Sequence, residues 1–366
     1  QAEPRPAPDK VYSTKACLVD GFEFDAAGFN VSESLLKGLD PVFHFALHAG
    51  RQAWRDAVTE GLDKRKVGVI IGNIALPTDH FSAHSRRLLA RELAAALGRP
   101  MTEPAEVHPF DRSPAGLPGG LLAQALGLGG GAFTLDAACA SSLYAIKMAV
   151  DALQDGRADA MLTGGVSRPD CLYTQMGFSQ LRALSPTGRP SPLDASGDGL
   201  VVGEGAGIFV LKRLPDALRD GDKVYGVLRG AGLSNDIGGS LLAPDGGGQL
   251  RAMRAAYAQA NLKPADIDLY ECHATGTPVG DVVEMKSLQT LWGESGWKPG
   301  QCALGSVKSN VGHLLTGAGA AGLMKVLLAM KEKTLPPSAN FTRTPSGADL
   351  AGTPFRVQGE AAAWEP

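Results

Sequence analysis

The chain has 366 residues, of which 44% are hydrophobic and 20% charged, a composition typical of a globular protein and not of a disordered one. Its 35 Lys and Arg residues against 38 Asp and Glu give a net charge of −3 without any basic block, so binding to nucleic acid or to a membrane surface through a polybasic patch is not expected. No apolar run reaches the roughly 18 residues that a membrane span needs. The first residues, from Gln1 on, are expected to be a linker or the edge of a longer chain.

Strands and helices are predicted to alternate after an opening region of loops and helix pieces that ends in an amphipathic stretch at 41–60. In the first half, strands are predicted at 66–72, 131–135, 158–163 and 207–212, and helices at 82–98 and 140–154. In the second half, strands are predicted at 223–233, 267–272 and 302–307, and helices at 247–260, 280–293 and 317–331. This alternation indicates α/β layers with largely parallel sheets. The polar segment 213–222 predicts a division into 1–215 and 216–366.

Cys139 is the candidate nucleophile among five cysteines. It follows a predicted strand and stands among small residues at the start of the 140–154 helix, in DAACASSL. The unpaired N–H groups and the dipole of a helix N-terminus favour a thiolate there. The alternative is a buried structural cysteine, which is the expectation for the other four. Because no C-x-x-C spacing occurs, neither a disulfide framework nor a zinc site is expected, and a reducing cytoplasm is the expected compartment.

Two of the seven histidines stand where a partner for this thiol is expected. His273 and His313 each come just after a predicted strand, as Cys139 does, and sites in α/β sheets assemble at that edge. The alternative for each is a hydrogen-bonded loop histidine. The other histidines show no metal-ligand pattern, and no phosphate-binding P-loop motif occurs. Asp281 and Glu284 could simply form a capping box.

Three motifs resemble the active-site motifs of β-ketoacyl synthases. They are DAACASSL at Cys139, ECHATGTPVGD at His273, and GSVKSNVGH at Lys308 and His313. Their order and their separations of 134 and 40 residues fit that family, and the similarity extends from about residue 12 to 356. The stretches TQMGFSQLRALSPTGRPSPLDASGDGLVVGEGAG and LSNDIGGSLLAPDGGGQLRAM resemble most the iterative multidomain synthases of polyunsaturated fatty acids and heterocyst glycolipids.

The resemblance implies a thiolase fold, in which two similar halves stack as α-β-α-β-α layers, usually in a homodimer. It implies that Cys139 receives an acyl chain from an acyl carrier protein as a thioester. His273 and His313 would bind the malonyl thioester, promote loss of CO2 and stabilise the enolate, whose carbon then attacks the Cys139 thioester.

The resemblance also assigns supporting residues. Lys308, paired with Glu284, would hold the two-histidine site together, and Thr275 and Thr277 would hydrogen-bond the phosphopantetheine arm. No tightly bound cofactor and no metal are implied, and the expected partners are acyl carrier protein domains, a second copy of the chain and further domains of a multidomain synthase.

The chain departs from the family pattern at several places. Ala274 stands where many relatives have Gly, and Gly322, nine residues after His313, stands where some stand-alone synthases have Glu. Both ends are expected to be truncated relative to the family, without its first strand and its G-F-G-G-T-N-A-H loop. The Phe of that loop supplies a backbone N–H to the reacting oxyanion, so these 366 residues alone are expected to condense poorly.

Four alternatives to this activity stay open at the sequence level. A thiolase acting on acyl-CoA would need a second reactive cysteine, for which Cys272 and Cys302 are available. A non-catalytic scaffold subunit resembling a chain-length factor typically lacks the cysteine or a histidine, and a decarboxylase-only relative would have Gln in place of Cys139. A cysteine hydrolase would need one histidine with an orienting Asn or Asp.

Overall fold

The computed structural model describes residues 10–98, 100, 106–239 and 244–365. The predicted linker at the start of the chain and residues 240–243 of the glycine-rich segment lie outside this range.

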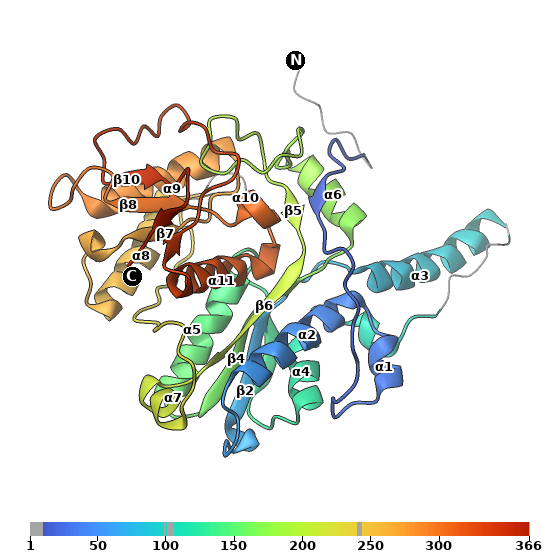
Figure 1. Cartoon of the computed structure of the whole chain (residues 1–366). Coiled ribbons are helices and arrows are strands. Elements are labelled where there is room, and N and C mark those ends of the chain that lie inside the picture. Colours follow the sequence, from blue (N-terminus) through green and yellow to red (C-terminus); the bar gives the residue numbers. More distant parts are fainter. Residues whose placement is uncertain (1–9, 99, 101–105, 240–243, 366) are drawn as a thin grey trace.

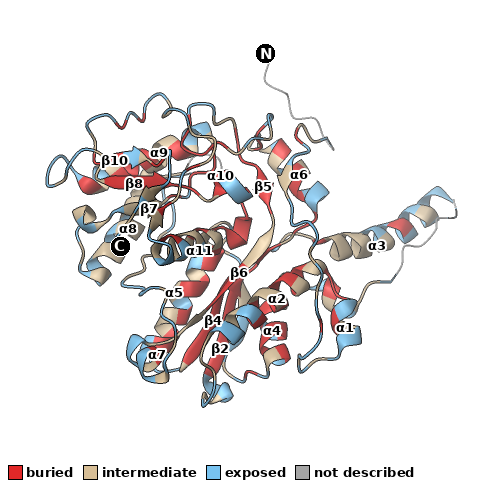
Figure 2. Cartoon of the chain, viewed as in Figure 1, coloured by how far each residue is buried: buried red, intermediate tan, exposed pale blue. Residues whose placement is uncertain are grey.

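The first half is built on a sheet whose described strands follow the order β3-β2-β4-β6. These strands are β2 (Val67–Gly72), β3 (Ala132–Leu135), β4 (Ala160–Ser167) and β6 (Gly205–Leu211). β2 pairs in parallel with β3 and β4, and β6 runs antiparallel to β4. Every residue of β2 and β4 is buried (Figure 2), because helices cover both faces of the sheet.

Two pairs of helices cover this sheet. α2 (Pro41–Asp56) and α4 (Pro118–Leu126) pack on the outer face, where Phe43 and Leu122 join Val69 of β2 in the largest core cluster. α5 (Ser141–Gln154) and α11 (Ala318–Lys331) pack on the inner face, where Ala145 and Ala149 meet Ile70. The predicted helices at 140–154 and 317–331 are therefore confirmed, and they form the central layer.

The second half contributes a parallel sheet in the described order β10-β8-β7. Its strands are β7 (Leu269–Glu271), β8 (Cys302–Gly305) and β10 (Phe355–Val357), and its outer helices are α8 (Gly246–Ala260) and α9 (Pro278–Trp292). Met285 and Leu288 of α9 pack on Leu304 of β8, while α11 contacts β7 from the other side. The two sheets therefore enclose α5 and α11 and carry helices outside (Figure 1), which confirms the five-layer arrangement expected.

Shorter elements connect these layers. They are β1 (Ala16–Cys17), α1 (Glu33–Lys37), α3 (Asp79–Leu97), α6 (Cys171–Gln180), β5 (Val202–Gly203), α7 (Leu214–Asp220), α10 (Lys308–Val311), β9 (Thr334–Leu335) and β11 (Ala362–Ala363). α3 confirms the helix predicted at 82–98 and projects from the body of the molecule (Figure 1). None of the helices among the described residues is both long and apolar enough to cross a membrane.

The strand predicted at 223–233 is wrong. This segment is extended, but no strand pairs with it anywhere in the described residues, and Val227 and Leu228 keep 49% and 43% of their surface exposed. It lies along α8 instead, where Gly230 and Gly232 approach the helix so closely that an added Cβ would meet a backbone oxygen at 2.3 and 1.9 Å. The β-branched residues favour an extended backbone, but a strand also needs a neighbour.

Candidate active site

A sharp turn between β3 and α5 presents Cys139. The Asp136 carboxylate accepts the N–H groups of Ala75 and Ala138 at 2.7 and 2.8 Å, and the Ser141 hydroxyl donates to the Ala138 carbonyl at 2.6 Å. Ala138 has φ of +50°, a left-handed backbone that L-residues adopt at a cost. This turn places Cys139 directly before the helix N-terminus, as the sequence predicts.

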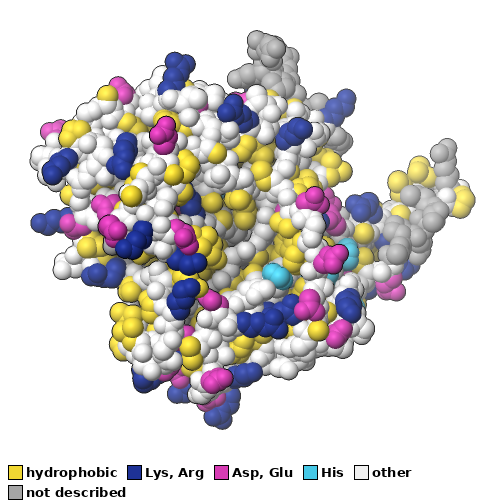
Figure 3. Space-filling model, viewed as in Figure 1, with side chains coloured by type: hydrophobic (Ala, Val, Ile, Leu, Met, Phe, Trp, Pro, Cys, Tyr) yellow, Lys and Arg dark blue, Asp and Glu magenta, His cyan; other side chains and the backbone are white. Residues whose placement is uncertain are grey.

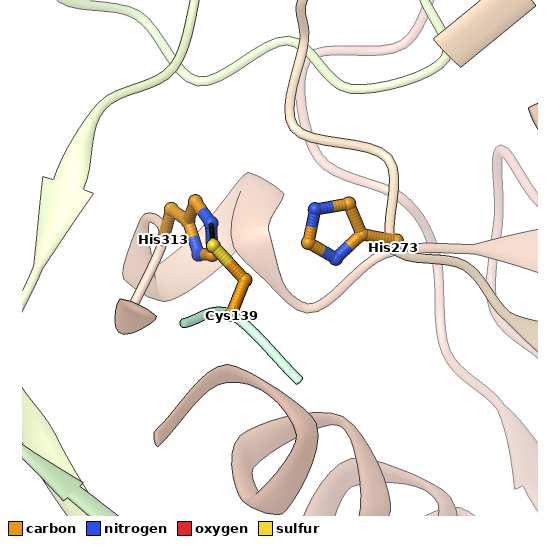
Figure 4. Close-up of side chains that lie close together, drawn as sticks. All are labelled: Cys139, His273 and His313. Atoms are coloured by element: carbon orange, nitrogen blue, oxygen red, sulfur yellow. Dashed lines mark hydrogen bonds between the residues drawn. The ribbon is translucent and has the colours of Figure 1, made fainter. Parts of the chain in front are cut away.

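His313 crosses from the second half to meet this thiol. Its backbone N–H donates to the Val201 carbonyl at 2.7 Å and its carbonyl accepts the Gly203 N–H at 2.9 Å, so β5 of the first half fixes its place. Its Nε2 lies 3.0 Å from Cys139 Sγ (Figure 4). Its Nδ1 accepts the Leu315 N–H at 3.3 Å, so the neutral ring carries its proton on Nε2 and donates it to the sulfur.

His273 completes the group from a separate loop after β7. Its ring lies across that of His313, with centroids 5.3 Å apart and planes at 85° (Figure 4). The nitrogen and sulfur atoms offered by Cys139, His273 and His313 all lie within 4.8 Å of one another. The structure therefore brings together the three residues that the sequence predicts, from both halves of the chain.

The protonation states differ from the prediction at the cysteine. Burial raises the pKa of the Cys139 thiol, and this effect is larger than the opposite effect of the Lys308 charge. The helix N-terminus was expected to favour the thiolate, but the thiol form is favoured instead. The pKa of His313 is well below its usual value, mainly through desolvation and further through His273 and Lys308. The pKa of His273 is lowered in the same way, although its side chain keeps exposed surface. Both rings are therefore neutral hydrogen-bond donors at neutral pH.

The ion pair predicted between Lys308 and Glu284 is not formed. Glu284 instead accepts the backbone N–H groups of His273 and Ala274, each at 2.7 Å, and thereby anchors the histidine loop. Lys308 is only 5% exposed and interacts with the Glu284 charge across a longer distance. Burial raises the pKa of Glu284 to about 7, which opposes a fixed negative charge there.

The two threonines lie on the same loop. Thr275 and Thr277 share a hydrogen bond between their hydroxyls at 3.0 Å, and Thr277 lines a cavity of about 470 Å³ together with Gly276 and Arg343. Asp281, 5% exposed, accepts the N–H groups of Thr275 and Gly276 at 3.0 to 3.2 Å and so holds the loop's shape. The sequence predicts Asp281 only as part of a helix cap, although its place one turn after the threonines also indicates this role.

Sequence reasoning also missed a buried ion pair beside the site. Glu271, two residues before His273, binds Lys325 of α11 at 2.6 Å, and both side chains are 11% exposed. A charged residue at the buried end of a strand was the available signal, since such charges are rarely buried unpaired.

Neither a metal nor a second thiol fits the chemistry of the site. A metal would need a free lone pair on His313 Nε2, which carries the proton, and the nearby Lys308 charge would repel a cation. Cys272 and Cys302 are buried, and burial raises their pKa values, to about 12 for Cys302. A thiolase reaction that uses one of them as a base is therefore disfavoured.

Comparisons with known proteins agree with the geometry. Residues 1–217 match the family described as "Beta-ketoacyl synthase, N-terminal domain" and residues 225–342 match "Beta-ketoacyl synthase, C-terminal domain". The PKS-NRPS hybrid synthetase ATPKS of Aspergillus niger is 38% identical over 98% of this chain, and the polyketide synthase PksL of Bacillus subtilis is 35% identical over 97%. The chain spans only 19% and 8% of the lengths of these two relatives.

Solved structures give the same result. The structure named "PfaC Keto synthase-Chain length factor" superposes with a TM-score of 0.90 at 38% identity, covering 98% of this chain and 40% of that one. The ketosynthase from module 6 of the bacillaene synthase of Bacillus subtilis 168 gives a TM-score of 0.79 at 33% identity, covering 94% of this chain and 57% of that one. These likenesses confirm the thiolase fold, and with the matched family models they show that the chain belongs to the β-ketoacyl synthase family.

Proposed function

We propose that the chain catalyses decarboxylative Claisen condensation between an acyl group on Cys139 and a malonyl thioester on an acyl carrier protein. The single observation that carries this proposal is the 3.0 Å contact from His313 Nε2 to Cys139 Sγ, with His273 completing the group. One thiol faces two neutral imidazoles, which suits a nucleophile beside two donors to a developing oxyanion.

The first half-reaction loads the chain. Cys139 Sγ attacks the carbonyl carbon of the acyl thioester, the bond to the carrier's sulfur breaks, and the carrier leaves as a thiol with the proton that Cys139 gives up. Because burial favours the protonated thiol, the hydrogen bond from His313 Nε2 is the contact that stabilises the thiolate.

The second half-reaction forms the carbon–carbon bond. The malonyl carboxyl group leaves as CO2, and its bonding electron pair passes into an enolate whose oxygen accepts hydrogen bonds from His273 and His313. The enolate carbon attacks the Cys139 thioester, and the cysteine leaves as a thiolate that regains a proton from solvent. Neutral imidazole donors stabilise the enolate without protonating its carbon.

The carrier and its prosthetic arm are part of the same proposal. The hydroxyls of Thr275 and Thr277, which now bond to each other, would turn to the amides of the phosphopantetheine arm. Figure 3 shows one face of the molecule, which is hollowed near its centre and carries hydrophobic side chains there. We also propose that the chain is one domain of an iterative multidomain synthase, of the polyunsaturated fatty acid type, in a cytoplasmic homodimer. The relatives' names support the place within a larger synthase, since the chain spans only 19% and 8% of a PKS-NRPS hybrid synthetase and a polyketide synthase.

The alternative of a non-catalytic scaffold is supported only by the name of one structural neighbour, which couples a ketosynthase with a chain length factor. The intact group of Cys139, His273 and His313 favours the catalytic role.

Assaying the two half-reactions separately tests the proposal. With malonyl carrier protein, His273→Ala is expected to lower the decarboxylation rate by about 100-fold, the scale of losing one electrostatic donor, while acyl loading of Cys139 continues. Glu365→Gln, an exposed residue paired with Lys333, serves as the matched control and keeps the wild-type rate. Decarboxylation at the wild-type rate by the His273 variant would show that the assigned role is wrong.

A further inference from the structure

We infer that Glu271, held by Lys325, is a positioning residue that fixes His273 and Lys308 relative to each other. The inference rests on the proposed function, because it concerns the malonyl half-reaction of the same site.

The two oxygens of Glu271 connect three segments of the site. Oε2 binds Lys325 Nζ at 2.6 Å, and Oε1 accepts the backbone N–H of Val307 at 2.5 Å. Val307 directly precedes Lys308, and Glu271 itself is two residues before His273. One carboxylate therefore ties the end of β7 to the start of α10 and to the middle of α11.

Two neighbouring glycines leave room for this contact. A Cβ added at Gly322 would lie 3.0 Å from Glu271 Cγ and 3.6 Å from Oε1. A Cβ added at Gly305 would lie 2.7 Å from Lys325 Nζ. Gly322 is the position at which the sequence departs from stand-alone synthases that carry Glu, and in this chain the carboxylate occupies that space from β7 instead.

Charge supports the same role. Lys308 is 5% exposed and has no carboxylate in direct contact among the described residues, so distant charges balance it. Glu284 and Glu271 are the two acids that most favour its charged form. The carboxylate of Glu284 accepts the two backbone N–H groups of the histidine loop. The carboxylate of Glu271 instead accepts the N–H of Val307, the residue before Lys308.

The ion pair lies at the base of both segments that carry His273 and Lys308. Breaking it would leave Lys325 uncompensated and would free the Val307 N–H, so the start of α10 could shift relative to the histidine loop. A displacement of about 1 Å at reacting groups can cost about 100-fold in rate.

Relocating the carboxylate tests the inference. Glu271→Ala is expected to lower kcat for malonyl decarboxylation by about 100-fold with KM changed less than about threefold, while the rate of acyl loading at Cys139 is kept. Adding Gly322→Glu to this variant returns a carboxylate to the same space from α11, within reach of Lys325, and is expected to restore kcat at least about tenfold. Gly322→Glu alone is expected to be harmful, because its Cβ meets Glu271 Cγ.

A matched control separates positioning from stability. Asp222→Asn removes one charge from another buried ion-pair group. Lys212 binds Asp222 at 2.5 Å, with side chains 3% and 10% exposed, and it also binds Asp220 at 3.2 Å. The variant is expected to lower the melting temperature but to keep kcat. If Glu271→Ala does not melt cooperatively, Glu271→Gln, which keeps the side-chain size, is expected to lower kcat by about tenfold.

The outcomes are distinct. A Glu271 variant with the kcat of Asp222→Asn, or a relocated carboxylate that restores melting temperature but not kcat, would overturn the inference. A wild-type chain that folds but does not decarboxylate malonyl carrier protein would overturn the proposed function, and the inference with it.

Discussion

Glu284→Gln is predicted to remove the pH dependence of the malonyl half-reaction. In the wild-type chain each carboxylate oxygen accepts one backbone N–H at 2.7 Å, from His273 and from Ala274. The amide replaces one of these acceptors with a donor and leaves one backbone N–H without its acceptor, at a cost of up to about 1–3 kcal/mol. Loss of this hydrogen bond displaces His273 from the position in which it binds the enolate oxygen. We therefore expect decarboxylation to slow by about 10- to 100-fold.

The raised pKa of Glu284 gives the sign of the pH effect. Because the pKa of its carboxyl is raised from 4.5 to about 7 on folding, the folded chain binds more protons between these values, and stability falls as pH rises through this window. At about 1.4 kcal/mol per unit the wild-type chain loses about 3 kcal/mol across the window, a slope that the Gln variant lacks. The rate of malonyl decarboxylation changes in the opposite direction. It rises with pH, with a midpoint near pH 7, because the ionised Glu284 carboxylate accepts stronger hydrogen bonds from the histidine loop.

The assay is the pH profile of malonyl decarboxylation for both proteins, beside urea denaturation at several pH values. Glu365→Gln, which removes an exposed carboxylate, is the control and keeps both profiles. A Glu284→Gln variant that retained the activity midpoint near pH 7 would refute the reasoning, since Glu284 would then not be the titrating group.

Three further outcomes follow from the geometry. His313→Ala slows alkylation of Cys139 by iodoacetamide at neutral pH by about tenfold, because the thiolate loses its hydrogen-bond donor, whereas His273→Ala leaves the rate nearly unchanged. Ala138→Val lowers the free energy of unfolding in urea by about 1–2 kcal/mol or more, because φ is +50° there, and Ala138→Gly stays within about 1 kcal/mol of the wild type. Gly165→Ala, whose Cβ would meet the backbone oxygen of Thr316 at 2.5 Å, destabilises by about 1–3 kcal/mol and also slows alkylation; unchanged values would contradict the packing described.

The layered fold could be predicted because its central elements carry strong local signals. The buried run at 66–72 became β2, and the apolar spacing at 140–154 became α5. The segment 223–233 shows the limit, since pairing depends on a neighbour that local sequence does not contain. β5 and β10 were not predicted. They have only two and three residues, and so short a segment forms a strand only when it pairs with another strand that is distant in the sequence.

The grouping of Cys139, His273 and His313 could be predicted from the sequence, but the electrostatics around them could not. Cys139, His273 and His313 each follow a predicted strand. Sites in α/β sheets assemble at the carboxyl ends of strands, so this placement and the family motifs together predict that the three side chains lie close to one another. The thiol's raised pKa and the missing Lys308–Glu284 contact depend on burial and on loop geometry, which no spacing encodes. The Glu271–Lys325 pair joins residues 54 positions apart, so only the folded chain reveals it.

Acyl transfer to and from Cys139 tests the central claim most directly. The chain is loaded from an acyl carrier thioester, freed of excess carrier, and then mixed with malonyl carrier protein, while intact-protein mass spectrometry follows both proteins. The account predicts one acyl adduct on Cys139, none on Cys139→Ala, and slow transfer of that acyl mass onto the malonyl carrier as a β-ketoacyl product with loss of CO2. An adduct of equal yield on the alanine variant, or release of the acyl group only as free acid, would contradict it.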